Sequence, residues 1–182
     1  MRITAGTHRS RVLKTLDSTI SRPTSDKVRQ AIYSRIGPYF QDSTMLDVFS
    51  GTGAMALEGL SRGMAHVTCI EKNAQARRLI LDNVTLLNET ANVTLINGDA
   101  LNVLDTLGQV FDVIFVDPPY DYPYFESIIE TLVARCTHSN SLIIVESDAH
   151  KDLPTTVGTF TCVHSKRYGQ TLISYYEDQT ND

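Results

Sequence analysis

From residue 44 onward, short apolar runs alternate with longer amphipathic segments, and this alternation constrains the fold more than any other feature of the sequence. Strands separated by helices form a parallel sheet that is covered on both faces, so the predicted fold class is α/β. Tyr168-Gly169 separates two further apolar runs, which predict a terminal antiparallel hairpin. The predicted strands cover 45–49, 67–70, 93–96, 113–116, 142–146, 159–165 and 171–176, and the predicted helices cover 25–36, 54–62, 74–87 and 124–135, with another beginning near Ala100.

A chain of 182 residues suits a single domain with a substantial core. We divide it into an N-terminal arm, residues 1–24, and an α/β core, residues 25–182. Short apolar and basic alternations in residues 1–16 favour a small hairpin. No apolar run approaches the about 20 residues that a membrane span requires, and Met1-Arg2-Ile3 does not open a signal peptide, so we expect a cytoplasmic protein.

Charge is distributed unevenly along the chain. The first 35 residues carry eight basic and two acidic side chains, whereas the rest carry eight basic and nineteen acidic ones. A basic arm on an acidic body can bind phosphates, because Lys and Arg release condensed counterions there. A solvated leader remains the alternative interpretation. On the first interpretation we assign Arg9, Arg11 and Arg29 to contacts with RNA.

A glycine turn follows the first predicted strand, in the segment from Asp47 to Gly53. Glycine lets the backbone approach a ligand closely, and ligands of doubly wound sheets bind at the carboxyl ends of the strands. We therefore assign Asp47, Gly51 and Gly53 to cofactor binding. A plain tight turn would use the same residues.

Two acidic residues follow the next two strands. Glu71 comes directly after the second strand and twenty residues beyond Gly51, where a carboxylate can accept both hydroxyls of a ribose. Asp99, followed by Ala100, comes after the third strand and can accept from an adenine amino group, although it can also cap a helix. Together with the glycine turn these residues predict an adenosine site. They do not distinguish a dehydrogenase from a methyltransferase.

Asp117-Pro118-Pro119-Tyr120, after the strand 113–116, favours the methyltransferase. The exocyclic amine of a nucleobase is a poor nucleophile because its lone pair is delocalised into the ring. The Asp117 carboxylate and the Pro118 carbonyl can accept its N–H groups, and Tyr120 offers a face on which an extruded base can stack. This pattern predicts S-adenosylmethionine as cofactor and Asp117, Pro118 and Tyr120 as catalytic residues.

Cysteine and histidine spacing argues against other chemistry. The three cysteines are far apart and none follows a proline, so base-carbon methylation through a cysteine nucleophile is not expected. The five histidines lack metal-ligand spacing such as HExxH, and no metal is predicted.

The chain resembles the RsmD-type enzymes, the bacterial 16S ribosomal RNA guanine-N2 methyltransferases. The resemblance rests on Arg2-Ile3 with Gly6, Arg9 and Arg11, on Arg22 to Arg29 (RPTSDKVR), on Leu46 to Gly53, on Leu60 to Gly63, on Asp117 to Tyr120 and on Tyr168 to Thr171. It implies a Rossmann-like, seven-stranded methyltransferase fold with an N-terminal hairpin that helps to hold RNA. It also implies that Arg22, Thr24 and Asp26 border the cofactor and substrate cleft, and that the partner is 16S rRNA or the small ribosomal subunit. We expect a monomer.

Other functions fit part of the pattern. An amino-methyltransferase acting on DNA adenine or on a protein glutamine uses a similar acceptor loop, and a nicotinamide-dependent oxidoreductase shares the adenosine half of the cofactor. A catalytically silent RNA-binding scaffold predicts a damaged acceptor loop, whereas Asp117 and Tyr120 are both present.

Overall fold

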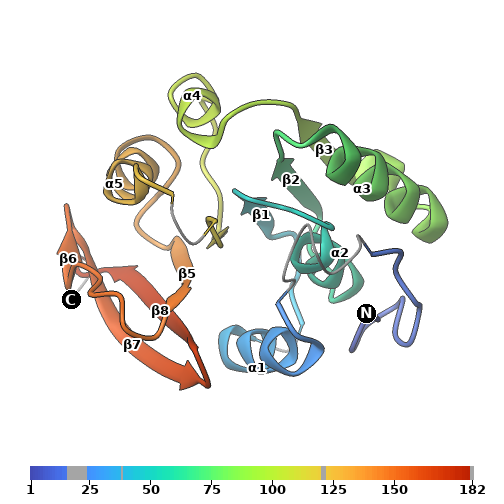
Figure 1. The fold of residues 1–182 in the computed structure, drawn as a ribbon, viewed down its shortest axis with the longest axis horizontal. Helices are drawn as coiled ribbons and strands as arrows, with labels where there is room; N and C mark the ends of the chain where they lie inside the picture. The colour runs from blue at the N-terminus through green and yellow to red at the C-terminus, as the bar shows by residue number, and fades with distance from the viewer. Residues whose placement is uncertain (16–23, 38, 120–121, 181–182) are drawn as a thin grey trace.

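The computed structural model describes residues 1–15, 24–37, 39–119 and 122–180, and Figure 1 shows how its elements are arranged. Five α-helices and one 3-10 helix alternate with eight strands in this part of the chain. In chain order they are α1 (Asp26–Ile36), β1 (Thr44–Asp47), α2 (Ala54–Ser61), β2 (His66–Ile70), α3 (Ala74–Leu87), η1 (Thr90–Asn92), β3 (Val93–Ile96), α4 (Ala100–Leu104), β4 (Val113–Val116), α5 (Phe125–Arg135), β5 (Leu142–Asp148), β6 (Thr156–Val157), β7 (Phe160–Tyr168) and β8 (Thr171–Asp178).

All eight strands form one sheet in the order β3-β2-β1-β4-β5-β8-β7-β6. The five strands from β3 to β5 pair in parallel, and β8, β7 and β6 continue the sheet in antiparallel fashion. The predicted parallel sheet and terminal hairpin are thus confirmed. The seven-stranded expectation differs by one strand, because the two-residue β6 pairs with the start of β7 at the edge of the sheet.

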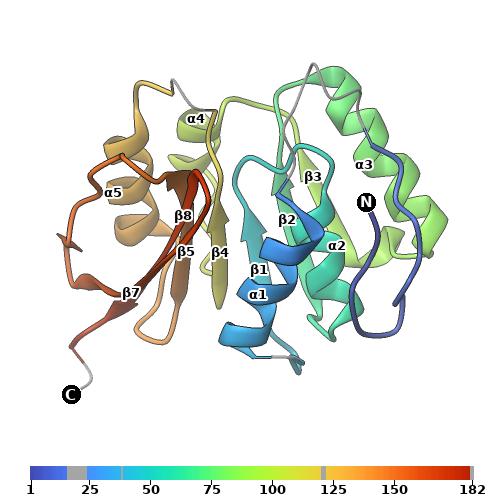
Figure 2. The same ribbon diagram turned by 60° about the horizontal axis from the view of Figure 1, so that its bottom comes forward.

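Two hydrophobic cores lie on opposite faces of this sheet. Figures 1 and 2 show the helices that lie on its two sides. Side chains alternate along each strand, so that Met45 of β1 faces one core and its neighbour Leu46 faces the other. The first core packs α1, α2 and α3 against the sheet, and the second packs α4 and α5. Covering both faces explains why the central strands are almost continuously apolar.

The N-terminal arm is packed into the first core. Arg2 and Val12 form an antiparallel bridge, and the side chains of Ile3 and Leu13 are buried. At Gly6, which has a φ of +83°, a Cβ atom would lie 1.6 Å from the carbonyl oxygen of Ser61, so glycine is required for this close approach. The predicted hairpin is present as a short bridged loop, and the arm is not a loose leader over residues 1–15.

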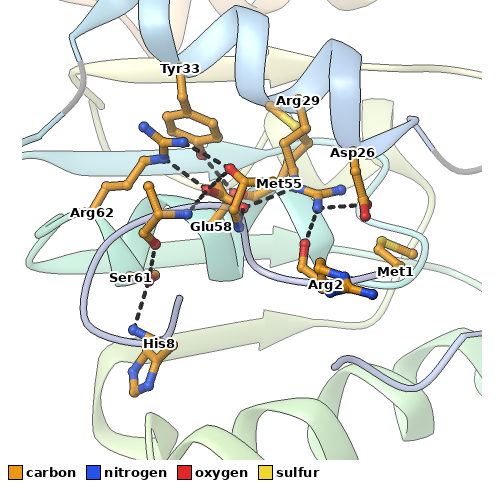
Figure 3. A network of polar contacts seen from close by, with 12 residues as sticks. Met1, Arg2, His8, Asp26, Arg29, Tyr33, Met55, Glu58, Ser61 and Arg62 are labelled. Carbon is orange, nitrogen blue, oxygen red and sulfur yellow. Dashed lines mark hydrogen bonds and ion pairs between the residues drawn. The ribbon is translucent and has the colours of Figure 1, made fainter. Parts of the chain in front are cut away.

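Glu58 anchors the arm from the middle of α2 (Figure 3). Its buried carboxylate accepts the backbone N–H groups of Thr4, at 2.9 Å, and of Ala5, at 3.1 Å. It also accepts the Nε–H groups of Arg29, at 3.2 Å, and of Arg62, at 2.8 Å. Burial alone raises the pKa of a carboxyl group, but the hydrogen bonds from Thr4, Arg62 and Arg29 hold the pKa of Glu58 below its ordinary value.

This network corrects the assignment of Arg29 to RNA. The Arg29 side chain is fully buried, and its Nη2 group donates to the backbone oxygen of Arg2 and to Asp26 Oδ1. A guanidinium in that position cannot reach a phosphate. Its charge instead balances Glu58 and Asp26, because a buried ion is stable only when it is paired and hydrogen-bonded.

We expect Glu58→Gln to lower the free energy of unfolding by about 3–5 kcal/mol, because it leaves two buried guanidinium groups without their shared counter-charge. The measurement is urea denaturation at pH 7, with exposed Glu130→Gln on α5 as the control, expected within about 0.5 kcal/mol of wild type. A depressed folded pKa adds stability that is lost as the pH falls below about 4.3, so the variant should also lose less stability than wild type in that range. A Glu58→Gln protein as stable as the control would contradict the role of this network.

Candidate functional site

A cavity of about 900 Å³ opens at the carboxyl ends of β1, β2, β4 and β5. The sheet order reverses direction between β1 and β4, and this is the place where open α/β sheets bind their ligands. Seven of the residues predicted to bind cofactor or to act in catalysis converge here. Those lining the cavity are Thr24, Asp47, Gly51, Glu71, Ala100, Asp117 and Pro118.

The glycine turn forms one wall of this cavity. Gly51 and Gly53 have φ values of +53° and +74°, a region that L side chains rarely adopt. A Cβ atom on Gly51 would meet nothing within 4 Å, whereas one on Gly53 would press on Ile80 of α3 at 3.3 Å. Gly51 therefore exposes its backbone to the cavity without a side chain in the way. Gly53 allows α2 to pack closely against α3.

Glu71 stands beside this turn. Its Oε2 atom accepts the N–H of Gly51 at 2.8 Å, and its Oε1 atom accepts the N–H of Asn73 at 2.7 Å. These bonds fix the orientation of the carboxylate at the cavity wall. Each carboxylate oxygen has a further lone pair, so the group can still accept the two hydroxyls of a ribose.

Asp99 caps α4 and borders a second hollow. Its Oδ1 atom accepts the N–H of Leu101 at 3.3 Å and the hydroxyl of Tyr122 at 3.4 Å, and Lys72 lies 3.7 Å from Oδ2. The side chain lines an adjoining space of about 520 Å³, while its neighbours Gly98 and Ala100 line the main cavity. The capping role is thus present, whereas Asp99 itself lines only the adjoining space and not the main cavity.

Asp47 is the most buried acid of the site. Its side chain is only 1% exposed, and its Oδ2 atom has no hydrogen-bond partner. Burial raises its pKa to about 7; a hydrogen bond from the backbone of Ala56 opposes this shift, and the charge of Glu71 adds to it. A buried orphan acceptor at the wall of a cavity is costly by itself, and it fits a ligand that supplies a donor or a positive charge.

Asp117 follows β4, the strand that pairs with β1. Burial raises the pKa of its carboxyl group well above the ordinary value, and the charges of Glu146 and Asp47 raise it further. Pro118 and Pro119 line the cavity beside it. Tyr120 and Arg22 lie outside the described residues.

Sequence reasoning missed Glu146 on β5. Val145 of β5 pairs with Val116 of β4, so Glu146 and Asp117 follow at the same level on neighbouring parallel strands. Thr24, predicted at the cleft, donates its hydroxyl to Glu146 Oε2 at 2.9 Å. An acidic residue at the end of the fifth predicted strand was the available signal, since acids after three other strands had already been assigned to the site. Lys151, Phe125 and Tyr168 also line the cavity and were not predicted from spacing.

Arg9 and Arg11 lie on the exposed side of the arm. The Nη2 group of Arg11 donates to the backbone oxygen of Leu86 at 2.9 Å, and His8 contacts Glu89 at 2.5 Å, so the loop is tied to the C-terminal end of α3. Both arginines are therefore presented by a fixed support.

The described helices include none that is long and apolar enough to cross a membrane. Within the same residues, no three His, Cys, Asp or Glu side chains are grouped so as to hold a metal ion.

Comparison with known proteins agrees with this geometry. The chain is 33% identical over 178 residues to the ribosomal RNA small subunit methyltransferase D of Escherichia coli K12, a match that covers 97% of this chain and 89% of that protein. The solved structure of the yhhF protein of Escherichia coli superposes with a TM-score of 0.89 at 31% identity, over 100% of this chain and 99% of that one. The structure of SMU.776 complexed with SAH has a TM-score of 0.67 at 16% identity, over 82% of this chain and 48% of that one, and shares the fold.

The family described as Conserved hypothetical protein 95 matches residues 1–177, which is nearly the whole chain. The Rossmann-like methyltransferase fold that the sequence predicted is confirmed by these neighbours. The chain therefore belongs to the Conserved hypothetical protein 95 family, the RsmD family that its motifs indicated.

Proposed function

We propose that this protein transfers a methyl group from S-adenosylmethionine to the exocyclic N2 amine of a guanine in 16S ribosomal RNA. The observation that carries the proposal is the placement of Asp117 and Pro118 in the same cavity as the glycine turn and Glu71. The names of its relatives support the same activity, since the Escherichia coli relative is a ribosomal RNA small subunit methyltransferase. We expect the enzyme to act as a monomer in the cytoplasm.

The cavity residues fit the proposed cofactor. The open backbone at Gly51 suits close approach of the amino acid part, and Glu71 suits the ribose hydroxyls. Gly98 and Ala100 line the adenine end, with Asp99 beside them. The orphan Oδ2 of Asp47 suits an ammonium or sulfonium charge nearby. When bound, S-adenosylmethionine supplies an activated methyl group on a sulfonium.

Asp117 performs the central step of the proposed mechanism. Its carboxylate accepts one N–H of the target amine, and the carbonyl of Pro118 accepts the other, so that the nitrogen lone pair is directed toward the methyl group. The raised pKa of Asp117 makes its carboxylate a stronger base than an ordinary aspartate. It is therefore suited to take the proton that the nitrogen loses once the new N–C bond has formed.

The arm is the proposed RNA support. Ile3 and Leu13 anchor it in the core, and Arg9 and Arg11 face solvent. Since the body of the protein is acidic, these cations supply a local attraction for phosphates that the net charge of -5 does not reveal.

The proposed function is tested by mapping methylated bases in 16S rRNA from cells with and without the gene, and by adding the purified protein and S-adenosylmethionine to the unmodified RNA or subunit. We expect one N2-methylguanine to disappear on deletion and to reappear in vitro. A methyl group on adenine, on DNA or on a protein glutamine would refute the substrate assignment.

We expect Asp117→Asn to reduce the rate of methyl transfer by about 10²–10⁴-fold while changing the cofactor Kd little, because Asn keeps the size of the side chain but removes the base. Glu71→Gln is the matched comparison and should raise the cofactor Kd about tenfold, with most of the rate recovered at saturating cofactor. Calorimetric binding and single-turnover transfer separate the two effects. Equal loss of binding and rate in Asp117→Asn would exclude the catalytic role.

We expect the double change Arg9→Gln, Arg11→Gln to weaken RNA binding and to reduce the slope of log K against log salt by about 1.4–1.8, the release expected from two phosphate contacts. Binding is measured by titration at several salt concentrations. Arg135→Gln, an exposed cation on α5 beyond the opposite face of the sheet, should leave the slope unchanged. A slope in the double variant equal to that of wild type would remove the arm from the RNA interface.

A further inference from the structure

Glu146 lies next to Asp117, but the proposed mechanism of methyl transfer gives Glu146 no role. The pairing of Val145 with Val116 places Glu146 and Asp117 at neighbouring positions on β5 and β4, and both line the cavity. Adjacent strands lie about 4.8 Å apart. A planar base that presents its amine to Asp117 can therefore place one of the ring atoms that flank the amine toward Glu146.

We propose that Glu146 is the residue that selects the base, by accepting the ring N1–H of guanine while Asp117 and Pro118 hold the N2 amine. This inference rests on the proposed function and adds the group that determines which amine is methylated. Flipped bases are generally recognised through their Watson–Crick edges, which is the edge that this arrangement would read.

The selection follows from the pattern of donors and acceptors. Guanine carries a ring N–H donor directly beside its exocyclic amine, whereas adenine and cytosine carry an unprotonated ring nitrogen there. The side-chain amide of a protein glutamine carries a carbonyl oxygen beside its amine. A carboxylate only accepts hydrogen bonds, so it pairs with guanine and faces a lone pair in the other three cases. Leaving those two acceptors opposed, with the base seated against the partly buried Glu146, is unfavourable.

The surroundings of Glu146 support this role. Thr24 donates to Oε2 at 2.9 Å from the segment that leads into α1, which fixes the orientation of the carboxylate. The three acids Asp47, Asp117 and Glu146 line the same cavity, and the charge of Glu146 contributes to the raised pKa of Asp117. The Watson–Crick edge of guanine, with its adjacent ring and amine donors, complements such a wall.

The test compares guanine with 2-aminopurine, which has the same N2 amine but an unprotonated N1. Two 16S transcripts that differ only at the methylated position, once that position has been mapped, are assembled into small subunits and given to the full-length enzyme. We expect wild type to prefer guanine by at least about tenfold in kcat/KM, the discrimination of one well-placed hydrogen-bonding group. Glu146→Gln, whose amide can donate to the unprotonated N1, should lower that preference by at least about tenfold.

Glu130→Gln on the exposed face of α5 is the matched control and should keep the wild-type preference. Thermal unfolding and cofactor binding of each variant establish that the site is intact. The inference would be overturned if wild type methylated the two bases at equal rates, a result that needs no variant. It would also be overturned if Glu146→Gln lost both rates in parallel. If wild type methylates no guanine N2 at all, the proposed function fails instead, so the two failures are distinguishable.

Discussion

The carboxylate of Glu58 joins three parts of the chain that are distant in sequence. Five hydrogen bonds converge on it: the backbone and hydroxyl of Thr4, the backbone of Ala5, and the guanidinium groups of Arg29 and Arg62. Because α2 begins at Ala54, directly after Gly53, this buried centre also holds the helix that follows the glycine turn. A desolvated ion of this kind is stable only with its full set of partners, so the arm, α1 and α2 must be in place together.

The fixed arm connects fold and function. A free basic leader would lose conformational entropy on binding RNA, whereas a loop bonded to α2 and α3 is already ordered. Its cations can therefore serve as a fixed platform beside an otherwise acidic body. The basic residues of the N-terminal stretch therefore have two different roles. Arg9 and Arg11 are exposed to solvent, whereas the buried Arg29 neutralises the carboxylates of Asp26 and Glu58.

The carboxyl groups of the cavity differ from that of Glu58 in how their pKa values are shifted. Glu58 accepts several hydrogen bonds and has a lowered pKa. Asp47 and Asp117 have raised pKa values, because burial and the charges of neighbouring acids outweigh the one backbone hydrogen bond, from Ala56, that opposes the shift of Asp47. Perturbed acids of this type concentrate at functional sites. A cationic cofactor and a base rich in N–H donors would supply the missing partners, which is the electrostatic basis of the proposed function and of the role inferred for Glu146.

The sequence by itself determined the elements, the order of the parallel units and the main loops of the site. These features are local patterns, and local backbone preference is enough to form the structures that they predict. They are the alternating apolar runs, the glycines at 51 and 53, and Asp117-Pro118-Pro119. Sequence could not place Glu58, which reads as an ordinary charged position in a short helix yet is fully buried. Nor could it separate Arg29 from Arg9 and Arg11, or bring Glu146 to Asp117. Those outcomes depend on which segments pack against one another over separations of tens of residues, and only the assembled sheet with its two covered faces decides them.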